Sequence, residues 1–257
     1  GGVTMDLMTI LGLLMGCGAV YYVMAQGQIT SLLFNLSAAI LVFGGTFAST
    51  LITYPFKIIK QAPKALKLVM FPSKRYTASE AIDTLVRLAT MAKMGGIAVL
   101  ANEIHNLRDN FLIDGIQMVT DNLDPEMIRE NLEKEIVFTR RRHQQISGIF
   151  RTMGTYAPIF GLLGTLIGVV QVLRNLADPN TMGASMAIAV TTTFYGIFGT
   201  NFIFLPIAGK LNAHSEEELL LKEVMIEGIL SIQKGEIPLI VERKLQAFLA
   251  YKLRRRA

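Results

Sequence analysis

The stretch from Leu7 to Phe56 contains no aspartate, glutamate, lysine or arginine in 50 consecutive residues. As one straight α-helix it would be about 75 Å long, more than twice the roughly 30 Å thickness of a bilayer's hydrocarbon core. The stretch is therefore predicted to fold back at Gln26-Gly27-Gln28, giving spans over residues 7–25 and 29–55. A cleavable signal peptide is the alternative for the first span, but no basic segment precedes it and a second apolar span follows.

Composition supports a membrane protein, since 51% of the residues are hydrophobic, 18% are charged and the mean hydropathy is +0.43. The single cysteine, Cys17, excludes an internal disulfide and a cysteine-ligated zinc site. We find no nucleophile–base pair, phosphate loop or metal cluster, so neither an enzyme nor a resident cofactor is expected. The net charge of +5 would suit a nucleic-acid partner, but in a membrane protein the positions of the positive residues matter more, so no nucleic acid is expected.

Residues 57–151 are polar and are predicted to form a helical domain between two pairs of spans. Thr77-Ala-Ser-Glu80 has the pattern of a capping box, and Gly95-Gly96 is the expected end of that helix. Asp124-Pro125-Glu126 predicts the start of a long helix that continues into the membrane. No strand-like alternation of useful length is present.

A second uncharged region, residues 152–209, predicts another hairpin. The third span is expected from Thr152 to Leu173 and the fourth within Pro179 to Gly209, joined by Arg174 to Asp178. Residues 210–257 are expected to form a cytoplasmic helix and tail, and residues 1–6 a short N-terminal segment with a tag remnant before Met5. The predicted fold is an all-α membrane protein with four transmembrane helices in two hairpins.

Positive residues predict the orientation. Fifteen lysines and arginines lie between Lys57 and Arg151, nine lie from Lys210 onward, and Arg174 is alone in the other loops. The positive-inside rule places both termini and the large loop in the cytoplasm.

The four spans contain no residue that could bind and release a proton, which argues against a complete pump. If ions cross here, a partner must supply the charge. The polar residues of the last two spans are the remaining candidates, although hydrogen bonding between helices is an equally ordinary role for them. They are Thr165, Gln171, Thr191, Thr192, Thr193, Thr200 and Asn201.

Small residues and prolines mark the same region. Glycines such as Gly161, Gly164 and Gly168 let helices approach closely. Pro158 and Pro206 each remove an intrahelical hydrogen bond and are predicted to be kinks or hinges.

The sequence resembles the MotA/PomA family of flagellar motor stator proteins over nearly its whole length. The most specific stretches are Ala157-Pro-Ile-Phe-Gly-Leu-Leu-Gly-Thr-Leu-Ile-Gly168, Asn175-Leu-Ala-Asp-Pro179, Met186-Ala-Ile-Ala-Val-Thr-Thr-Thr-Phe-Tyr-Gly196 and Asn201-Phe-Ile-Phe-Leu-Pro-Ile-Ala208. The resemblance implies a homopentamer in the bacterial inner membrane around a dimer of a MotB or PomB partner, whose single span carries an ion-accepting aspartate. Ion influx then drives rotation and torque on the rotor protein FliG.

The same resemblance implies roles for five residues of the spans. Pro158 and Pro206 match the family's two functional prolines, expected near the partner's aspartate. Thr165 and Thr193, with Thr192 beside them, match hydroxyl positions of sodium-type members and are expected to hold a transient Na⁺. Because sodium prefers hard oxygen ligands whereas a proton needs only water and the acid, sodium is favoured and a proton remains the alternative.

The rotor contacts implied by the resemblance are less regular. The family's basic residue three positions before a conserved glycine aligns with Lys93, but its usual glutamate aligns with Ala101. Arg87, Lys93 and Glu103 are therefore the predicted rotor contacts, with ordinary surface charge as the alternative.

The sequence is also compatible with two other functions. One is an ExbB or TolQ type energiser of outer-membrane processes, which normally has three spans. The other is a membrane scaffold whose spans only oligomerise.

Overall fold

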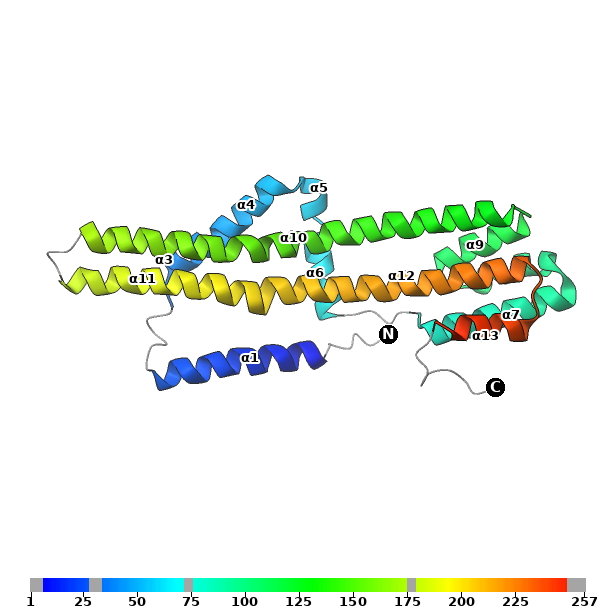
Figure 1. The fold of residues 1–257 in the computed structure, drawn as a ribbon, viewed down its shortest axis with the longest axis horizontal. Helices are drawn as coiled ribbons and strands as arrows, with labels where there is room; N and C mark the ends of the chain where they lie inside the picture. The colour runs from blue at the N-terminus through cyan, green and yellow to red at the C-terminus, as the bar shows by residue number, and fades with distance from the viewer. Residues whose placement is uncertain (1–6, 28–33, 72–75, 175–178, 249–257) are drawn as a thin grey trace. The chain divides into compact units, whose positions relative to one another are not determined.

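The computed structural model describes residues 7–27, 34–71, 76–174 and 179–248, and all regular elements in these ranges are helices (Figure 1). The predicted N-terminal segment (1–6), most of the first interhelical connection, the loop 175–178 and the basic end Lys252–Arg256 lie outside the described residues.

The chain divides into two compact units. The membrane unit comprises residues 1–73 and 143–213, and the charged unit comprises residues 74–142 and 214–257. Two long helices contribute to both units. They are α10 (Pro125–Arg174) and α12 (Leu205–Gln233).

The remaining elements of the membrane unit are short or of span length. They are α1 (Leu7–Gln26), α3 (Leu36–Ala39), the π-helical turn η1 (Ile40–Gly44), α4 (Gly45–Thr53), α5 (Phe56–Ile59), α6 (Ala62–Met70), α11 (Pro179–Phe198) and the π-helical turn η4 (Gly199–Phe204).

Within the described residues, four helices are long and apolar enough to cross a membrane, as the sequence predicted. Their apolar stretches lie within Met8–Gln26, Leu36–Thr53, Pro125–Arg174 and Met182–Gln233. Ile29, the predicted start of the second span, lies outside the described residues. Within them the helix begins at Leu36, because the Asn35 side chain accepts a hydrogen bond from the Ala38 amide at 3.0 Å and caps the helix there. It ends at Thr53, since Tyr54 precedes Pro55 and adopts an extended conformation.

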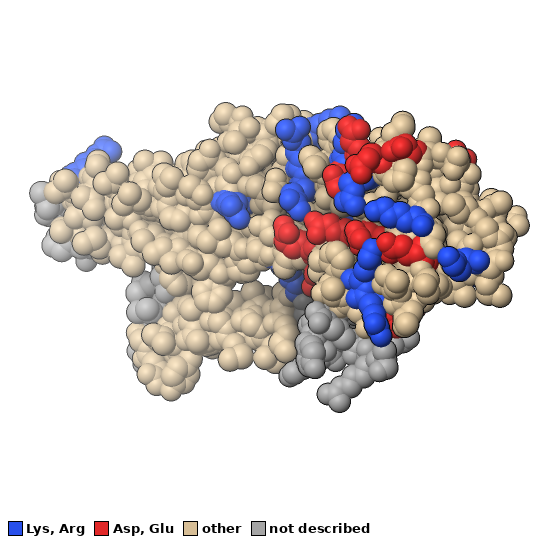
Figure 2. Space-filling view, turned by 45° about the vertical axis from the view of Figure 1, so that its right-hand side comes forward, with Lys and Arg blue, Asp and Glu red and all other residues tan. Residues whose placement is uncertain are grey.

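The charged unit is a helical domain with one apolar core. Its other elements are α7 (Ala78–Gly95), η2 (Ile97–Val99), α8 (Leu100–Glu103), η3 (Ile104–Asn106), α9 (Asn110–Thr120) and α13 (Pro238–Gln246). Leucines and isoleucines at helical spacing on α7, α9, α10 and α12 fill the core, among them Leu85, Leu88, Ile116, Leu132 and Ile229. Figure 2 shows lysines, arginines and acids intermingled on the surface of this unit.

The helix signals predicted for this unit are confirmed. Thr77 and Glu80 form both hydrogen bonds of a capping box at the start of α7. The helix stops at Gly95, and Gly96 has a φ of 80°, a conformation that favours glycine. Asp124 accepts a hydrogen bond from the Glu126 amide at 2.9 Å, and α10 starts at Pro125.

Candidate functional site

The α10 and α11 helices approach each other along a row of glycines. A Cβ atom added to Gly164 would lie 2.5 Å from the Thr192 side chain, and one added to Gly196 would lie 2.6 Å from the Ala157 carbonyl oxygen. Gly168 faces Ala189 in the same way. Because only glycine leaves room for this approach, the small residues fix the spacing of the two helices.

The threonines predicted as a sodium site are brought together by this close approach. Thr165 of α10 and Thr193 of α11 are hydrogen-bonded through their hydroxyls. The Thr165 hydroxyl also lies 3.1 Å from the Ala189 carbonyl oxygen and 3.2 Å from the Gly161 carbonyl oxygen. Thr193 Oγ1 lies 3.4 Å from the same Ala189 oxygen. Two hydroxyls and two carbonyls therefore converge, with two protons shared among four oxygen atoms.

Thr192 contributes differently. Its side chain is fully buried, and its hydroxyl donates to the Ala189 carbonyl at 2.9 Å within its own helix. Its methyl and hydroxyl fill the space opposite Gly164. Thr192 thus packs the helix pair, and its oxygen joins the cluster only through the shared Ala189 carbonyl.

Pro158 lies inside α10, which continues on both sides of it. A proline has no amide hydrogen, so the carbonyl four residues earlier, that of Gly154, has no α-helical donor. Thr200 of η4 donates its hydroxyl to this carbonyl at 2.9 Å. Thr200 is 8% exposed, so the contact is nearly shielded from solvent.

Pro206 is the second residue of α12 and is separated from the π-helical turn η4 by Leu205 alone. In this turn the Leu205 amide donates to the Thr200 carbonyl, five residues earlier. The turn thus changes the hydrogen-bond register just ahead of Leu205 and Pro206, and Pro206 has no amide hydrogen with which to continue the ladder. The Asn201 side chain, also in η4, donates to the Ile197 carbonyl at 2.9 Å. Pro206 itself lines an apolar groove of 560 Å³ between α1, α6, η4 and α12.

Two further hydroxyl contacts join α4 to α10 and were not predicted. Tyr54 and Thr152 are hydrogen-bonded at 2.9 Å, and Thr53 and Tyr156 at 3.0 Å. The sequence carries no periodic signal for them, because partners separated by about 100 residues meet only through packing.

Two of the three predicted rotor-contact residues are paired with each other. Arg87 of α7 and Glu103 of α8 form a salt bridge of 2.7 Å, with side-chain exposures of 49% and 19%. The hydrogen bond from Arg87 lowers the pKa of the Glu103 carboxyl below its usual value. Glu103 therefore stands beside a basic residue of α7 although position 101 is alanine.

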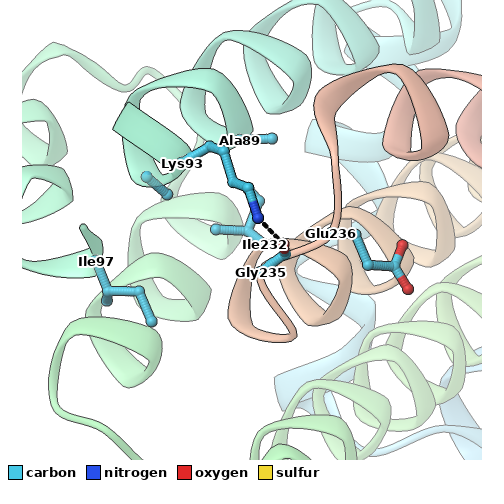
Figure 3. A pocket seen from close by; sticks show the side chains of 7 residues that line it. Ala89, Lys93, Ile97, Ile232, Gly235 and Glu236 are labelled. Atoms are coloured by element: carbon cyan, nitrogen blue, oxygen red, sulfur yellow. Dashed lines mark hydrogen bonds between the residues drawn. The ribbon is translucent and has the colours of Figure 1, made fainter. Parts of the chain in front are cut away.

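The third residue, Lys93, reaches from α7 to the turn that follows α12. Its ammonium donates to the Gly235 carbonyl at 3.1 Å and lines a hollow of 260 Å³ together with Glu236 (Figure 3). Glu236 is paired with Lys244 at 2.6 Å, and this hydrogen bond lowers the pKa of the Glu236 carboxyl. Lys93 thus has a structural contact at the carboxyl end of a helix, where a positive charge is favourable.

The described residues hold no group of three or more histidine, cysteine, aspartate or glutamate side chains that could bind a metal ion. The oxygen cluster of Thr165, Thr193, Ala189 and Gly161 is the chemically distinctive feature of the membrane unit. It is suited to transient contact with a hard cation.

Comparison with known proteins gives consistent matches. A family model described as the MotA/TolQ/ExbB proton channel family matches residues 103–224. Motility protein A of Borreliella burgdorferi is 36% identical over 249 residues, which cover 96% of this chain and 95% of that protein. Chemotaxis protein PomA of Vibrio alginolyticus is 35% identical over 246 residues, 95% of this chain and 96% of that protein.

Solved structures agree over the whole fold. The C. jejuni MotAB structure matches with a TM-score of 0.91 and 28% identity, covering 98% of this chain and 99% of that chain. The flagellar MotAB stator complex from Bacillus subtilis matches with a TM-score of 0.87 and 31% identity, covering 96% of each chain.

Proposed function

Because the chain belongs to the MotA/PomA family of flagellar motor stator proteins, we propose that with a MotB/PomB-type partner it couples ion influx to torque. The observation that carries the proposal is the convergence of the Thr165 and Thr193 hydroxyls with two backbone carbonyls, in spans that contain no acidic or basic side chain. The oxygen atoms of such a chain can contact a cation, but the chain has no negative side chain in its spans to balance the positive charge. It therefore needs a partner with a carboxylate in the membrane.

The proposed assembly is a homopentamer around a dimer of the partner in the bacterial cytoplasmic membrane. Both termini and the charged unit lie in the cytoplasm, because 24 of the 25 lysines and arginines flank the spans on that side. Pro158 interrupts the hydrogen-bond ladder of α10, which carries Thr165, and Pro206 interrupts that of α12, which follows α11 and its Thr193 through η4. These interruptions are the points at which a change of charge on the partner would move the helices.

Sodium is the proposed coupling ion. A dehydrated sodium ion needs several hard oxygen ligands at once, whereas a proton can pass along water to the partner's acid. Thr165 and Thr193 provide two hydroxyl oxygens beside the Ala189 and Gly161 carbonyls. No bound cofactor is required, because the ion itself is the transported substrate.

The charged unit is proposed to push on the rotor protein FliG. Arg87 and Glu103 present a paired charge, and Lys93 lies on the same helix as Arg87. Reversing Lys93 to glutamate is expected to reduce torque, and reversing an acidic residue of the rotor is expected to restore it. If Lys93→Glu reduces torque and no charge reversal in the rotor restores it, Lys93 does not contact the rotor, and its contact with Gly235 is its only assigned role.

The deciding experiment measures swimming speed in a host without stators that expresses this chain with its partner and a matching rotor. Sodium is replaced by potassium or choline at constant pH. We expect speed to rise with sodium concentration, and Thr165→Val to remove that dependence while Thr165→Ser keeps it. If swimming speed does not depend on sodium but falls to zero with a protonophore, the coupling ion is the proton and not sodium. Absence of swimming with a confirmed membrane complex would contradict the stator proposal.

A further inference from the structure

The interruption of α10 at Pro158 leaves one backbone acceptor in a position where an unmet hydrogen bond is costly. The Gly154 carbonyl lies four residues before Pro158, inside the membrane unit. A buried carbonyl without a donor costs about 1–3 kcal/mol, and in a bilayer water cannot replace the donor at low cost.

The donor that meets this acceptor comes from another helix. Thr200 Oγ1 lies 2.9 Å from the Gly154 oxygen. Three other threonines of the membrane unit, Thr46, Thr50 and Thr155, return their hydroxyls to the carbonyl four residues earlier in their own helix. Thr200 differs from these three because its hydroxyl is directed to a carbonyl of another helix, and that carbonyl is the one that Pro158 leaves without an amide donor.

Thr200 also takes part in the π-helical turn η4, the second place where the regular α-helical hydrogen bonding is interrupted. Its own carbonyl accepts the amide of Leu205, the residue that lies between η4 and Pro206. The packing around Gly154 reinforces this link, since a Cβ atom added there would lie 3.0 Å from the Leu205 side chain. One residue thus joins the carbonyl released by Pro158 to the backbone turn that leads into Pro206.

We infer that Thr200 is a positioning residue that couples the two proline-bearing helices. Its hydroxyl replaces the amide that Pro158 lacks, so a shift of α10 at Pro158 is passed to η4 and then to Pro206. This inference rests on the proposed stator function for its consequence in the motor. The contact itself concerns only this chain and can be tested without rotation.

The first test is a double-mutant cycle on the purified complex with its partner. Thr200→Val removes the hydroxyl at nearly constant volume, and Pro158→Ala gives residue 158 an amide that can donate to Gly154. Local opening of residues 154–160 is measured by native-state hydrogen exchange. We expect Thr200→Val to increase the opening constant by roughly 5- to 150-fold in the native background, as expected for one unmet buried hydrogen bond. In the Pro158→Ala background the increase should be much smaller.

Two variants serve as controls. Thr200→Ser keeps a hydroxyl and should retain most of the native protection. Thr50→Val removes a buried hydroxyl that is bonded to its own helix, at Thr46, and should leave residues 154–160 unchanged. Equal effects of Thr200→Val with and without Pro158 would overturn the inference, and so would equal effects of Thr200→Val and Thr50→Val. If Thr200→Val does not assemble, the inference requires that Pro158→Ala restores assembly, and failure to do so also overturns it.

The second test asks for the consequence in the motor. At equal amounts of complex, Thr200→Val should reduce stall torque severalfold while Thr200→Ser retains it. Unchanged torque in Thr200→Val, with the cycle showing coupling, would overturn the transmission role. If the native complex drives no swimming at all, the proposed function fails, whereas the exchange cycle still decides whether Thr200 holds Gly154.

Discussion

At the scale of single residues, the membrane unit depends on side chains that are absent as much as on those present. Gly161, Gly164 and Gly168 allow α11 to lie against α10, and only this distance lets Thr165 reach Thr193 and the Ala189 carbonyl. The glycines therefore set the distance between α10 and α11 that the threonine contacts require.

We predict that Gly164→Ala destabilises the complex by about 1–3 kcal/mol, because the added methyl group must displace the buried Thr192 side chain. The measurement is the thermal midpoint of the purified complex. Gly12→Ala is the matched control, since a Cβ atom at Gly12 meets no atom within 4 Å. A Gly164→Ala variant as stable as the Gly12→Ala control would show that the helices separate without cost.

The Arg87–Glu103 pair predicts a pH dependence with a definite sign. Arg87 holds the pKa of Glu103 below its unfolded value, which is about 4.3. The stabilisation by the pair is therefore complete above the unfolded pKa and is lost as the pH falls through the folded pKa.

This dependence can be measured by comparing native Glu103 with Glu103→Gln. The variant should increase hydrogen exchange of residues 97–106 near neutral pH, and the difference from native should disappear in acid. Glu133→Gln, 3.5 Å from Arg129 on an exposed face of α10, should leave this segment unchanged at every pH. A difference for Glu103→Gln that persisted or grew in acid would contradict the assigned cause.

At the scale of elements, local sequence signals determine where the helices of the charged unit begin and end. The capping box at Thr77 and Glu80, the glycine stop at Gly96 and the cap at Asp124 were all readable from the sequence, because each depends on residues within one helical turn. Span existence was equally readable, since it needs only length and absence of charge.

We predict that Thr77→Ala destabilises α7 by about 1 kcal/mol, because it removes the hydroxyl that accepts the Glu80 amide. Thr90→Ala is the control on the same helix, where the exposed hydroxyl only returns to the Val86 carbonyl. Alanine is a better helix former than threonine, so this control should be neutral or slightly stabilising. Native-state hydrogen exchange of α7 distinguishes them, and equal protection in the two variants would exclude a role for the cap.

The elements that the sequence did not predict share one physical origin. The π-helical turns η1 and η4, the contact of Thr200 with Gly154 and the pairing of Tyr54 with Thr152 all depend on packing between distant segments. The unit boundaries show the same effect. The distribution of charged residues predicted a polar section over residues 57–151. In the structure, Ala65 of α6 is buried near Phe150 and Ala208, and α6 belongs to the membrane unit.

For the candidate site, the sequence named residues but did not give most of their contacts. The resemblance singled out Thr165, Thr193, Pro158 and Pro206, and the structure brings the two threonines into contact. The pairing of Arg87 with Glu103 across α7 and α8 was not predictable, because it depends on how the chain turns after Gly96. Lys93 was assigned to the rotor by alignment, and its bond to Gly235 is visible only in the folded chain.

At the scale of the whole molecule, function is divided between chains. This chain has hydroxyls, carbonyls and two interrupted helices in its spans, but no aspartate, glutamate, histidine, lysine or arginine there. A conformational cycle driven by ions requires a group whose charge the ion alters, since a ligand shifts an equilibrium only by its differential affinity for the two states. Under the proposed function, the titrating group therefore belongs to the partner and the moving parts belong to this chain.

This division predicts the behaviour of the reconstituted complex. In vesicles with an inward sodium gradient, the complex is expected to give sodium uptake above that of protein-free vesicles, once any resting block by the partner is removed. A partner in which the membrane aspartate is replaced by asparagine should assemble equally well but give no uptake, because the spans of this chain have no substitute charge. Thr165→Val with the native partner should lower uptake of sodium while proton uptake is retained or increased, since only the larger ion needs several oxygen ligands together. Full sodium uptake with the asparagine variant would place the essential charge elsewhere and contradict the assignment of the two roles to two chains.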